Sequence, residues 1–249
     1  MRRILAGMVL ALILTGCDAD DASDEKAAEA EKAPGAEQTI EIEKTLEVEK
    51  AAEAEKAAEA ERATEANQAF EEGTAAYKSG DYATALRLLE PIAERGSVPA
   101  QMLVGVMYFE GQGVQRDYPQ ALKWYRLAAE QGAPKAQTIV GNIYLQGNGV
   151  FPDDNEAVKW FQLAAEQGDA EAQNNLGVMY ASGKGVPQDY VQALVWFSLA
   201  AAQSSNPDQP KGSKDAVKNR DRAASQMSPE QIAAAQKLVS EWKPRPAAQ

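Results

Sequence analysis

The stretch that decides the fold is "ALVWFSLAAAQS" at residues 193–204, because near-copies of it stand at two earlier places in the chain. "ALKWYRLAAEQG" occupies residues 121–132 and "AVKWFQLAAEQG" occupies residues 157–168, so the unit recurs every 36 residues. A fixed period of about 20–50 residues is the sequence signature of proteins built from stacked repeats. Outside these stretches a glycine, a tyrosine and an aspartate are also in register: Gly105, Gly141 and Gly177; Tyr108, Tyr144 and Tyr180; Asp117, Asp153 and Asp189.

Each unit is predicted to form two α-helices joined by a glycine turn. The first helix carries the repeated Gly-x-x-Tyr, where glycine allows a neighbouring helix to approach closely. The second helix begins after the repeated aspartate, whose carboxylate can accept hydrogen bonds from free backbone N–H groups. Gly132 and Gly168 are expected to end this helix in the left-handed conformation. Three residues after the aspartates stand the side chains that complete a capping-box pattern: Gln120, Glu156 and Gln192.

The turns between the two helices read "GQGV", "GNGV" and "GKGV" and begin at Gly111, Gly147 and Gly183. The third copy lies in "SGKGV" at 182–186, a combination of glycine and lysine that also occurs in phosphate-binding loops. Such a loop needs four residues between its first glycine and Gly-Lys, and then Ser or Thr; here five residues follow Gly177, and another glycine follows the lysine. We therefore interpret these glycines as turn residues that adopt positive φ.

The units at 100–135, 136–171 and 172–206 resemble the Sel-one-like repeat family, a longer-turn relative of the tetratricopeptide repeat. An earlier unit at 67–99 has a short turn and no tryptophan, and it reads as a plain tetratricopeptide unit. The resemblance implies an all-α fold, a right-handed α-solenoid of stacked helix-turn-helix units. Residues 207–249 are predicted to be a C-terminal helical cap, with one helix over 214–225 and a second from Ser228 to about Trp242.

The amino terminus is predicted to direct the protein to a membrane. Two arginines precede a mostly apolar run from Ile4 to Leu14, which is shorter than the about 20 residues of a membrane span. This order of charge and apolar residues is the layout of a secretory signal peptide, and an uncleaved signal anchor is the alternative.

Leu14-Thr15-Gly16-Cys17 resembles the cleavage box of bacterial lipoproteins. The resemblance implies that residues 1–16 are removed and that Cys17 carries the acyl chains, including palmitate. Asp18 resembles the residue that retains enterobacterial lipoproteins in the inner membrane. We expect the protein on the periplasmic side of a bacterial membrane, with the inner membrane favoured over the outer.

Residues 17–66 are predicted to be an acidic linker rich in Ala, Glu and Lys. Positions 18–66 contain 17 acidic and 6 basic residues, a net charge of −11 out of −12 for the whole chain. "EKAAEA", at 49–54 and again at 55–60, places opposite charges three residues apart, which favours a solvated helix. A disordered low-complexity segment is the alternative, and in both forms the linker is a spacer. Since the sequence has no basic stripe, nucleic acid is not expected as a partner.

The sequence disfavours catalysis, because the chain has no histidine and one cysteine. It shows neither a nucleophile beside a base nor a cluster of metal ligands, so we expect no enzyme, no metal and no cofactor. Trp124, Trp160 and Trp196 could stack on a carbohydrate, but their strict period favours a place in the core.

The remaining candidate site is the concave surface, which the first helices of the units line in solenoids of this kind. Positions that differ between copies are not dictated by the repeat and are free to contact a partner. The predicted partner-binding residues are Met102, Val106, Phe109, Thr138, Asn142, Leu145, Asn174 and Val178, with Glu110, Gln146, Ala181 and Ser182 beside them.

The expected function is that of a non-enzymatic, lipid-anchored scaffold or adaptor, which binds a protein or peptide partner in the bacterial cell envelope through this groove. An envelope hydrolase, or a protein that binds β-lactams or peptidoglycan, is the alternative, because some secreted relatives in the family are described as binding or cleaving β-lactams. Those relatives are rich in cysteine, whereas this chain has one.

Overall fold

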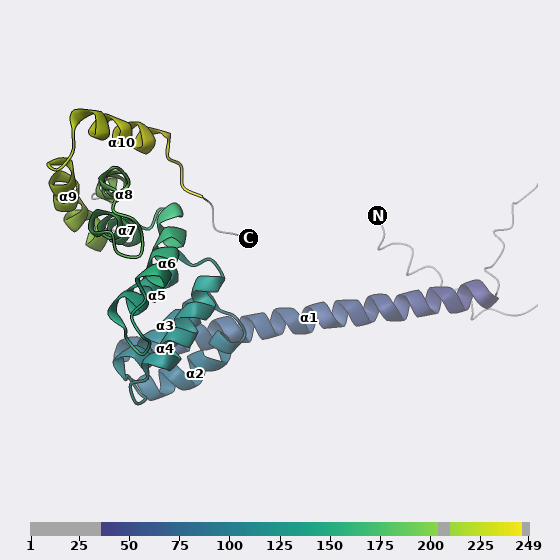
Figure 1. The fold of residues 1–249 in the computed structure, drawn as a ribbon. Coiled ribbons are helices and arrows are strands. Elements are labelled where there is room, and N and C mark those ends of the chain that lie inside the picture. Colours follow the sequence, from purple (N-terminus) through teal and green to yellow (C-terminus); the bar gives the residue numbers. More distant parts are fainter. Residues whose placement is uncertain (1–35, 204–209, 246–249) are drawn as a thin grey trace, which may run out of the picture. The chain divides into compact units, whose positions relative to one another are not determined.

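The computed structural model of the chain describes residues 36–203 and 210–245, and all regular structure in these ranges is α-helical. The predicted signal peptide, Cys17 and Asp18 lie outside the described residues. The chain divides into two units, Met1–Lys56 and Ala57–Gln249. The helices (Figure 1) are α1 (Ala36–Ser79), α2 (Tyr82–Glu94), α3 (Val98–Glu110), α4 (Tyr118–Glu130), α5 (Pro134–Gln146), α6 (Asp154–Glu166), α7 (Ala170–Ser182), α8 (Tyr190–Ala202), α9 (Pro210–Ala224) and α10 (Pro229–Glu241).

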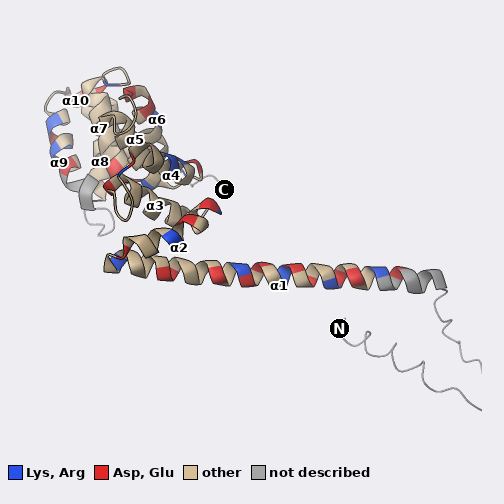
Figure 2. Ribbon diagram, turned by 90° about the horizontal axis from the view of Figure 1, so that it is seen from below, with Lys and Arg blue, Asp and Glu red and all other residues tan. Residues whose placement is uncertain are grey.

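In the first unit the described part of the acidic linker is a helix. Residues 36–56 all belong to α1, and the side chains at 44–50 are exposed. Acidic and basic residues alternate along this helix (Figure 2), as the three-residue spacing of opposite charges predicts. Of the two forms considered for the linker, the helical one is therefore present from residue 36 onward.

In the second unit the helices form successive helix-turn-helix pairs. The end of α1 pairs with α2, and α3 with α4, α5 with α6 and α7 with α8 follow as the later repeats. Phe70 and Tyr77 of α1 pack against a buried cluster that contains Leu89 of α2. The predicted all-α repeat solenoid is confirmed.

A glycine in each first helix lies against an aromatic ring of the second helix in the same repeat. A Cβ atom on Gly141 would lie 2.6 Å from Cε1 of Phe161, and the equivalent distances are 2.7 Å at Gly105 to Tyr125 and 2.6 Å at Gly177 to Phe197. Any side chain at these positions would overlap the ring. The repeated glycine is thus required for the close approach that its pattern predicted.

The glycine turns hold successive repeats together. Both glycines of each turn have positive φ, for example +69° at Gly183 and +67° at Gly185. A Cβ on Gly185 would lie 2.3 Å from the backbone oxygen of Asp154, in the preceding repeat. The backbone N–H of Lys184 donates to the carbonyl of Met179 at 3.1 Å, so this turn uses its N–H within the fold. The interpretation of "SGKGV" as a turn is confirmed.

The repeated aspartates cap the second helices as predicted, but the capping boxes are not formed. The Asp153 carboxylate accepts from the N–H groups of Asn155 and Glu156 at 2.9 and 3.0 Å. Its own backbone N–H, which a capping box would use, donates instead to the carbonyl of Tyr144 at 3.0 Å. Asp117 and Asp189 make the same bond to Tyr108 and Tyr180, whereas the pair Ser228 and Gln231 forms the complete box at the start of α10.

A ladder of buried glutamines, which the sequence did not predict, links each repeat to the next. Gln137 is 4% exposed; its Nε2 donates to the carbonyl of Ala129 at 3.1 Å, and its Oε1 accepts from Gln167 at 2.8 Å. Gln137 of α5 thereby bonds the second helix of the preceding repeat and also the end of the second helix of its own repeat. The same pair of bonds recurs at the two other junctions, through Gln101 with Gln131 and through Gln173 with Gln203.

The repeated aromatic residues belong to the core. Tyr125, Phe161 and Phe197 are at most 3% exposed. Trp124 is buried in the cluster of the preceding repeat, while Trp160 and Trp196 are half-buried against the clusters that precede them. The three tryptophans therefore pack in the core between repeats, as their strict period predicted.

The last two helices close the array. The predicted helix over 214–225 is α9 (Pro210–Ala224), which packs on α7 and α8, and α10 packs on α8. The chain then returns to α6, where Arg245 donates its backbone N–H to the carbonyl of Glu166 at 2.7 Å and pairs with the carboxylate of Glu166 at 2.7 Å.

The glutamine ladder predicts a specific loss of stability. Gln137→Met keeps an unbranched side chain but removes the bonds to Ala129 and Gln167, so we expect it to lower the free energy of unfolding by about 1–3 kcal/mol. Gln162→Met is the control, because Gln162 bonds Glu166 on the exposed surface and its loss is expected to cost under about 0.5 kcal/mol. Urea unfolding measures both; equal midpoints would contradict a structural role of the ladder.

Candidate functional site

The predicted partner-binding residues all lie on the first helices α3, α5 and α7, and several of them pack against or hydrogen-bond to neighbouring helices. Met102, Val106 and Phe109 are half-buried and pack against a cluster that includes Val140 and Ile143 of α5. The ring of Phe109 also meets Tyr118 edge-on, with centroids 5.0 Å apart. These three residues therefore pack into the core that α4 and α5 form beside α3.

Thr138 is too buried to contact a partner. It is 3% exposed, and its hydroxyl lies 3.0 Å from both the carbonyl of Pro134 and the carboxylate of Asp169. Asp169 in turn caps α7 by accepting from the N–H of Ala172 at 2.8 Å. Thr138 therefore joins α5 to the start of α7 and does not belong to the contact surface on which we had predicted it.

Asn142 and Asn174 also bond neighbouring first helices. The Asn142 amide donates to Glu171 at 3.2 Å and accepts from Asn175 at 3.1 Å, which joins α5 to α7. Asn174 accepts from Asn219 of α9 at 2.9 Å. Residues that differ between the repeats are thus used to make a different set of bonds at each junction.

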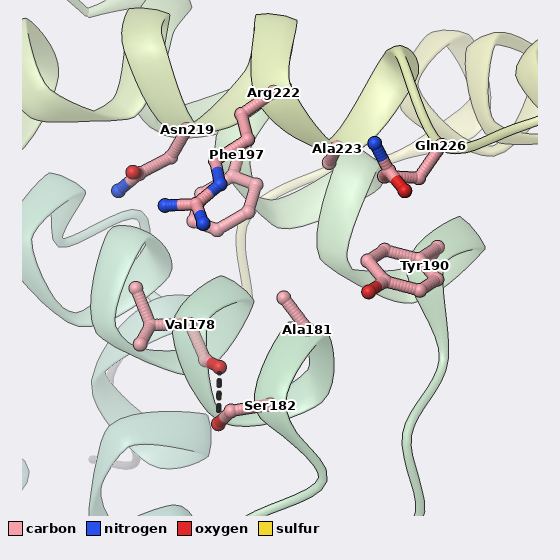
Figure 3. A pocket seen from close by; sticks show the side chains of 9 residues that line it. All are labelled: Val178, Ala181, Ser182, Tyr190, Phe197, Asn219, Arg222, Ala223 and Gln226. Atoms are coloured by element: carbon pink, nitrogen blue, oxygen red, sulfur yellow. Dashed lines mark hydrogen bonds between the residues drawn. The ribbon is translucent and has the colours of Figure 1, made fainter.

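Two pockets open between helices of adjacent units: one is lined by residues of α3, α4 and α5, and the other by residues of α7, α8 and α9. The α3–α5 pocket has a volume of about 290 Å³, and the α7–α9 pocket has a volume of about 420 Å³ (Figure 3). The α3–α5 pocket is lined by Phe109, Glu110, Tyr125, Ile139, Asn142, Ile143, Gln146 and Asn148. The α7–α9 pocket is lined by Val178, Ala181, Ser182, Tyr190, Phe197, Asn219, Arg222, Ala223 and Gln226.

These pockets are equivalent places on two junctions of the same array. Ala181, Ser182 and Phe197 stand two repeat lengths after Phe109, Glu110 and Tyr125. The lining residues of α9 have the same spacing along their helix as three of those of α5: residues 219, 222 and 223 against residues 139, 142 and 143, while Gln226 follows in the turn after α9 as Gln146 ends α5. Helix α9 therefore takes the place of a further first helix, although its sequence is outside the 36-residue frame.

The predicted residues thus divide between the junctions and the pockets. Phe109 and Asn142 line the α3–α5 pocket, and Val178, which is 42% exposed, lines the α7–α9 pocket. Leu145 is half-buried against the cluster around Phe161. The contributions of α9 could not be predicted from the 36-residue period, because its residues lie outside that frame.

The two pockets differ in charge. The α3–α5 pocket contains the Glu110 carboxylate beside the phenol of Tyr125. Burial raises the pKa of Tyr125 well above its ordinary value, and the negative charge of Glu110 raises this pKa further. The α7–α9 pocket has an arginine and no carboxylate among its lining residues.

Comparison with protein-family models finds the Sel1 repeat at residues 63–97, 98–132, 134–169 and 170–205. The chain belongs to the Sel1 repeat family. The match includes the first unit, which the sequence analysis described as a plain tetratricopeptide unit. Sel1 repeat proteins are generally scaffolds for protein interactions, and their fold is typically non-catalytic.

Two solved structures of Sel1 repeat proteins are similar to this chain. A Sel1 repeat protein from Oxalobacter formigenes is 31% identical, with a TM-score of 0.53 over 69% of this chain and 74% of that one. A protective antigen of uropathogenic Escherichia coli strains, which displays an SLR fold, is 28% identical, with a TM-score of 0.42 over 71% of this chain and 45% of that one. No curated protein matches the sequence.

Within residues 36–203 and 210–245 the Sel1 repeat chain holds no group of three or more His, Cys, Asp or Glu residues placed to bind a metal ion. None of the helices in these ranges is both long and apolar enough to cross a membrane.

The raised pKa of Tyr125 predicts how stability depends on pH. Above about pH 10 the unfolded chain releases this phenolic proton while the folded chain keeps it, so unfolding becomes easier by up to about 1.4 kcal/mol per pH unit. Tyr125→Phe should remove this part of the alkaline loss and leave stability near pH 7 nearly unchanged, since Phe161 and Phe197 occupy the equivalent places. Urea midpoints between about pH 8 and 11 test the prediction; parallel curves for the two proteins would refute it.

Proposed function

We propose that this protein is a non-enzymatic, lipid-anchored scaffold that binds a protein or peptide partner on the periplasmic side of a bacterial membrane, the inner membrane being favoured. The observation that carries the proposal is the pair of equivalent pockets along the first helices, at α3–α5 and at α7–α9. A polypeptide laid along this surface can place side chains in both pockets. This is how repeat arrays use an extended inner surface.

The pockets suit side chains better than a reaction. Each combines two aromatic rings with two or three amides and a single charged residue, Glu110 in one and Arg222 in the other. Volumes of about 290 and 420 Å³ lie at the lower end of the range for small-ligand sites. Neither set of lining residues pairs a nucleophile with a general base.

The anchor is supported by the lipoprotein box that ends at Cys17 and by the linker that follows it. Residues 36–56 are helical, and at about 1.5 Å per residue they make a rod about 30 Å long. The net charge of −11 over residues 18–66 disfavours contact with anionic lipid headgroups. Such a linker holds the repeats away from the membrane surface.

The anchor is tested by labelling growing cells with a palmitate analogue. We expect the chain to take up the label and Cys17→Ser to take up none, because Cys17 is the only cysteine. Asp18→Ser should move the labelled protein from inner-membrane to outer-membrane fractions, whereas Asp21→Ser should not. Label that persists in Cys17→Ser would overturn the lipoprotein assignment.

The binding surface is tested by a photo-crosslinking amino acid placed at single positions in intact cells. Gln146 and Ser182 are exposed residues of the two pockets. The controls are Lys159 on α6 and Lys237 on α10, whose side chains are 67% and 75% exposed. We expect Gln146 and Ser182 to capture the same protein and the controls to capture none of it. Val178→Glu should abolish capture from Ser182 without changing the helical circular dichroism signal. Capture from the control positions alone would contradict the proposed surface.

A further inference from the structure

The α7–α9 pocket contains a cation for which the described residues provide no carboxylate. The neighbouring Arg220 pairs with Asp221 at 2.8 Å, whereas no ion pair joins Arg222 to any Asp or Glu in the described part of the chain. Figure 3 shows the Arg222 guanidinium reaching from α9 toward Val178 on the facing helix α7. The cation therefore faces the pocket and remains available to an anionic group.

The fold already uses several of the polar groups near Arg222. Asn219 donates its amide N–H to Asn174 at 2.9 Å, and the Ser182 hydroxyl donates to the carbonyl of Val178 at 2.8 Å. The Tyr190 oxygen accepts from Gln188 at 3.3 Å, and its O–H is directed into the pocket at the end opposite Arg222 (Figure 3). The guanidinium and the phenol thus remain as hydrogen-bond donors to a ligand, together with the amide of Gln226, whose Nε2 also donates to the Ser225 hydroxyl at 3.3 Å.

Apolar side chains occupy the space between these donors. Ala181 and Ala223 lie between the guanidinium at one end of the pocket and the phenol at the other, and the Phe197 ring overlaps the guanidinium in this view (Figure 3). A ligand that fills this site therefore has a negatively charged group beside a small apolar group.

The α3–α5 pocket serves as an internal comparison for anion binding, because it has different residues at the positions equivalent to Ala181, Ser182 and Arg222. Glu110 stands where Ser182 stands, and Phe109 stands where Ala181 stands, so the earlier pocket is smaller and already contains an anion. At the place of Arg222 it has Asn142, whose amide is bonded to Glu171 and Asn175. Only the α7–α9 member of this pair combines a free cation with an apolar space.

We propose that the α7–α9 pocket binds the C-terminal residue of a partner polypeptide, with the terminal carboxylate on Arg222 and a small apolar side chain against Ala181 and Phe197. Arginine binds carboxylates through two parallel hydrogen bonds. A chain terminus carries its carboxylate and its side chain on the same carbon, so one residue supplies both features; a glutamate side chain has no apolar branch next to its carboxylate. The inference rests on the proposed function as a scaffold for polypeptides.

The test uses the full chain, purified in detergent, and the fluorescent peptide Gly-Gly-Gly-Val with a free C-terminus. We expect saturable binding that is at least about tenfold weaker for the same peptide with an amidated end. Arg222→Gln should weaken binding of the free acid by a similar factor, and Ser182→Glu should do the same by introducing the anion that the α3–α5 pocket contains. Arg220→Gln is the matched control on the same helix and should bind as the unmodified chain does.

Equal binding of the free acid and the amide, or full binding by Arg222→Gln, would overturn the proposal, as would the absence of saturable binding. Gly-Glu-Gly-Gly with an amidated end distinguishes the source of the carboxylate, and competition as strong as that of Gly-Gly-Gly-Val would refute a terminal group. The crosslinks from Gln146 in the other pocket depend only on the scaffold function. If they persist while the peptide result is negative, the carboxylate site alone is wrong.

Discussion

The structure of the repeats depends on the contact between a glycine in one helix and an aromatic ring in the next. Where Gly141 meets Phe161 the two helices are so close that a methyl group would overlap the ring. The ring is therefore held against the first helix, and one of its edges remains at the junction with the following repeat. The rings of Tyr125 and Phe197 reach the two pockets in this way, so the glycine that sets the helix spacing also places an aromatic group in each site.

Stacking of the repeats is secured by polar bonds as much as by apolar packing. On one side, buried glutamines such as Gln137 join the end of a second helix to the following repeat. On the other side, the first helices are joined by side chains that change from junction to junction, apolar at α3–α5 and hydrogen-bonded at α5–α7. The junctions are consequently alike in their buried bonds and different on the surface that a partner meets. This combination stabilises the stacking of the repeats and lets each pocket have its own chemistry.

The sequence predicted the features that depend on local backbone geometry. The repeat length, the positive φ of Gly183 and Gly185, and the capping by Asp153 all follow from residue types at short spacing. The prediction of capping boxes at the repeated aspartates was wrong, because the backbone N–H of Asp153 donates instead to the carbonyl of Tyr144, nine residues earlier.

The site was less predictable than the fold, because its contacts join distant residues. Gln101 and Gln131 recur with the period, yet Gln101 is buried and accepts a hydrogen bond from Gln131, a residue 30 positions later in the chain. Variation between repeats marked Val178, which lines the α7–α9 pocket, but it also marked Thr138, which is buried and bonded to Asp169. Helix α9 lies outside the 36-residue repeat, so the sequence pattern gives no position for its residues in the α7–α9 pocket. Only the structure shows that Arg222 lines this pocket.

Helix α9 combines two tasks that are separate in many repeat arrays, since it closes the last repeat and also supplies half of the terminal pocket. The number of repeats can therefore increase while α9 and α10 still close the array. A unit inserted before α9 would lengthen the protein and add a junction of its own. The terminal pocket would form again at the new last repeat wherever that unit ends its first helix in small residues, as Ala181 and Ser182 do here. The length of the array and the ligand preference of its terminal pocket can thus change independently when a repeat is duplicated.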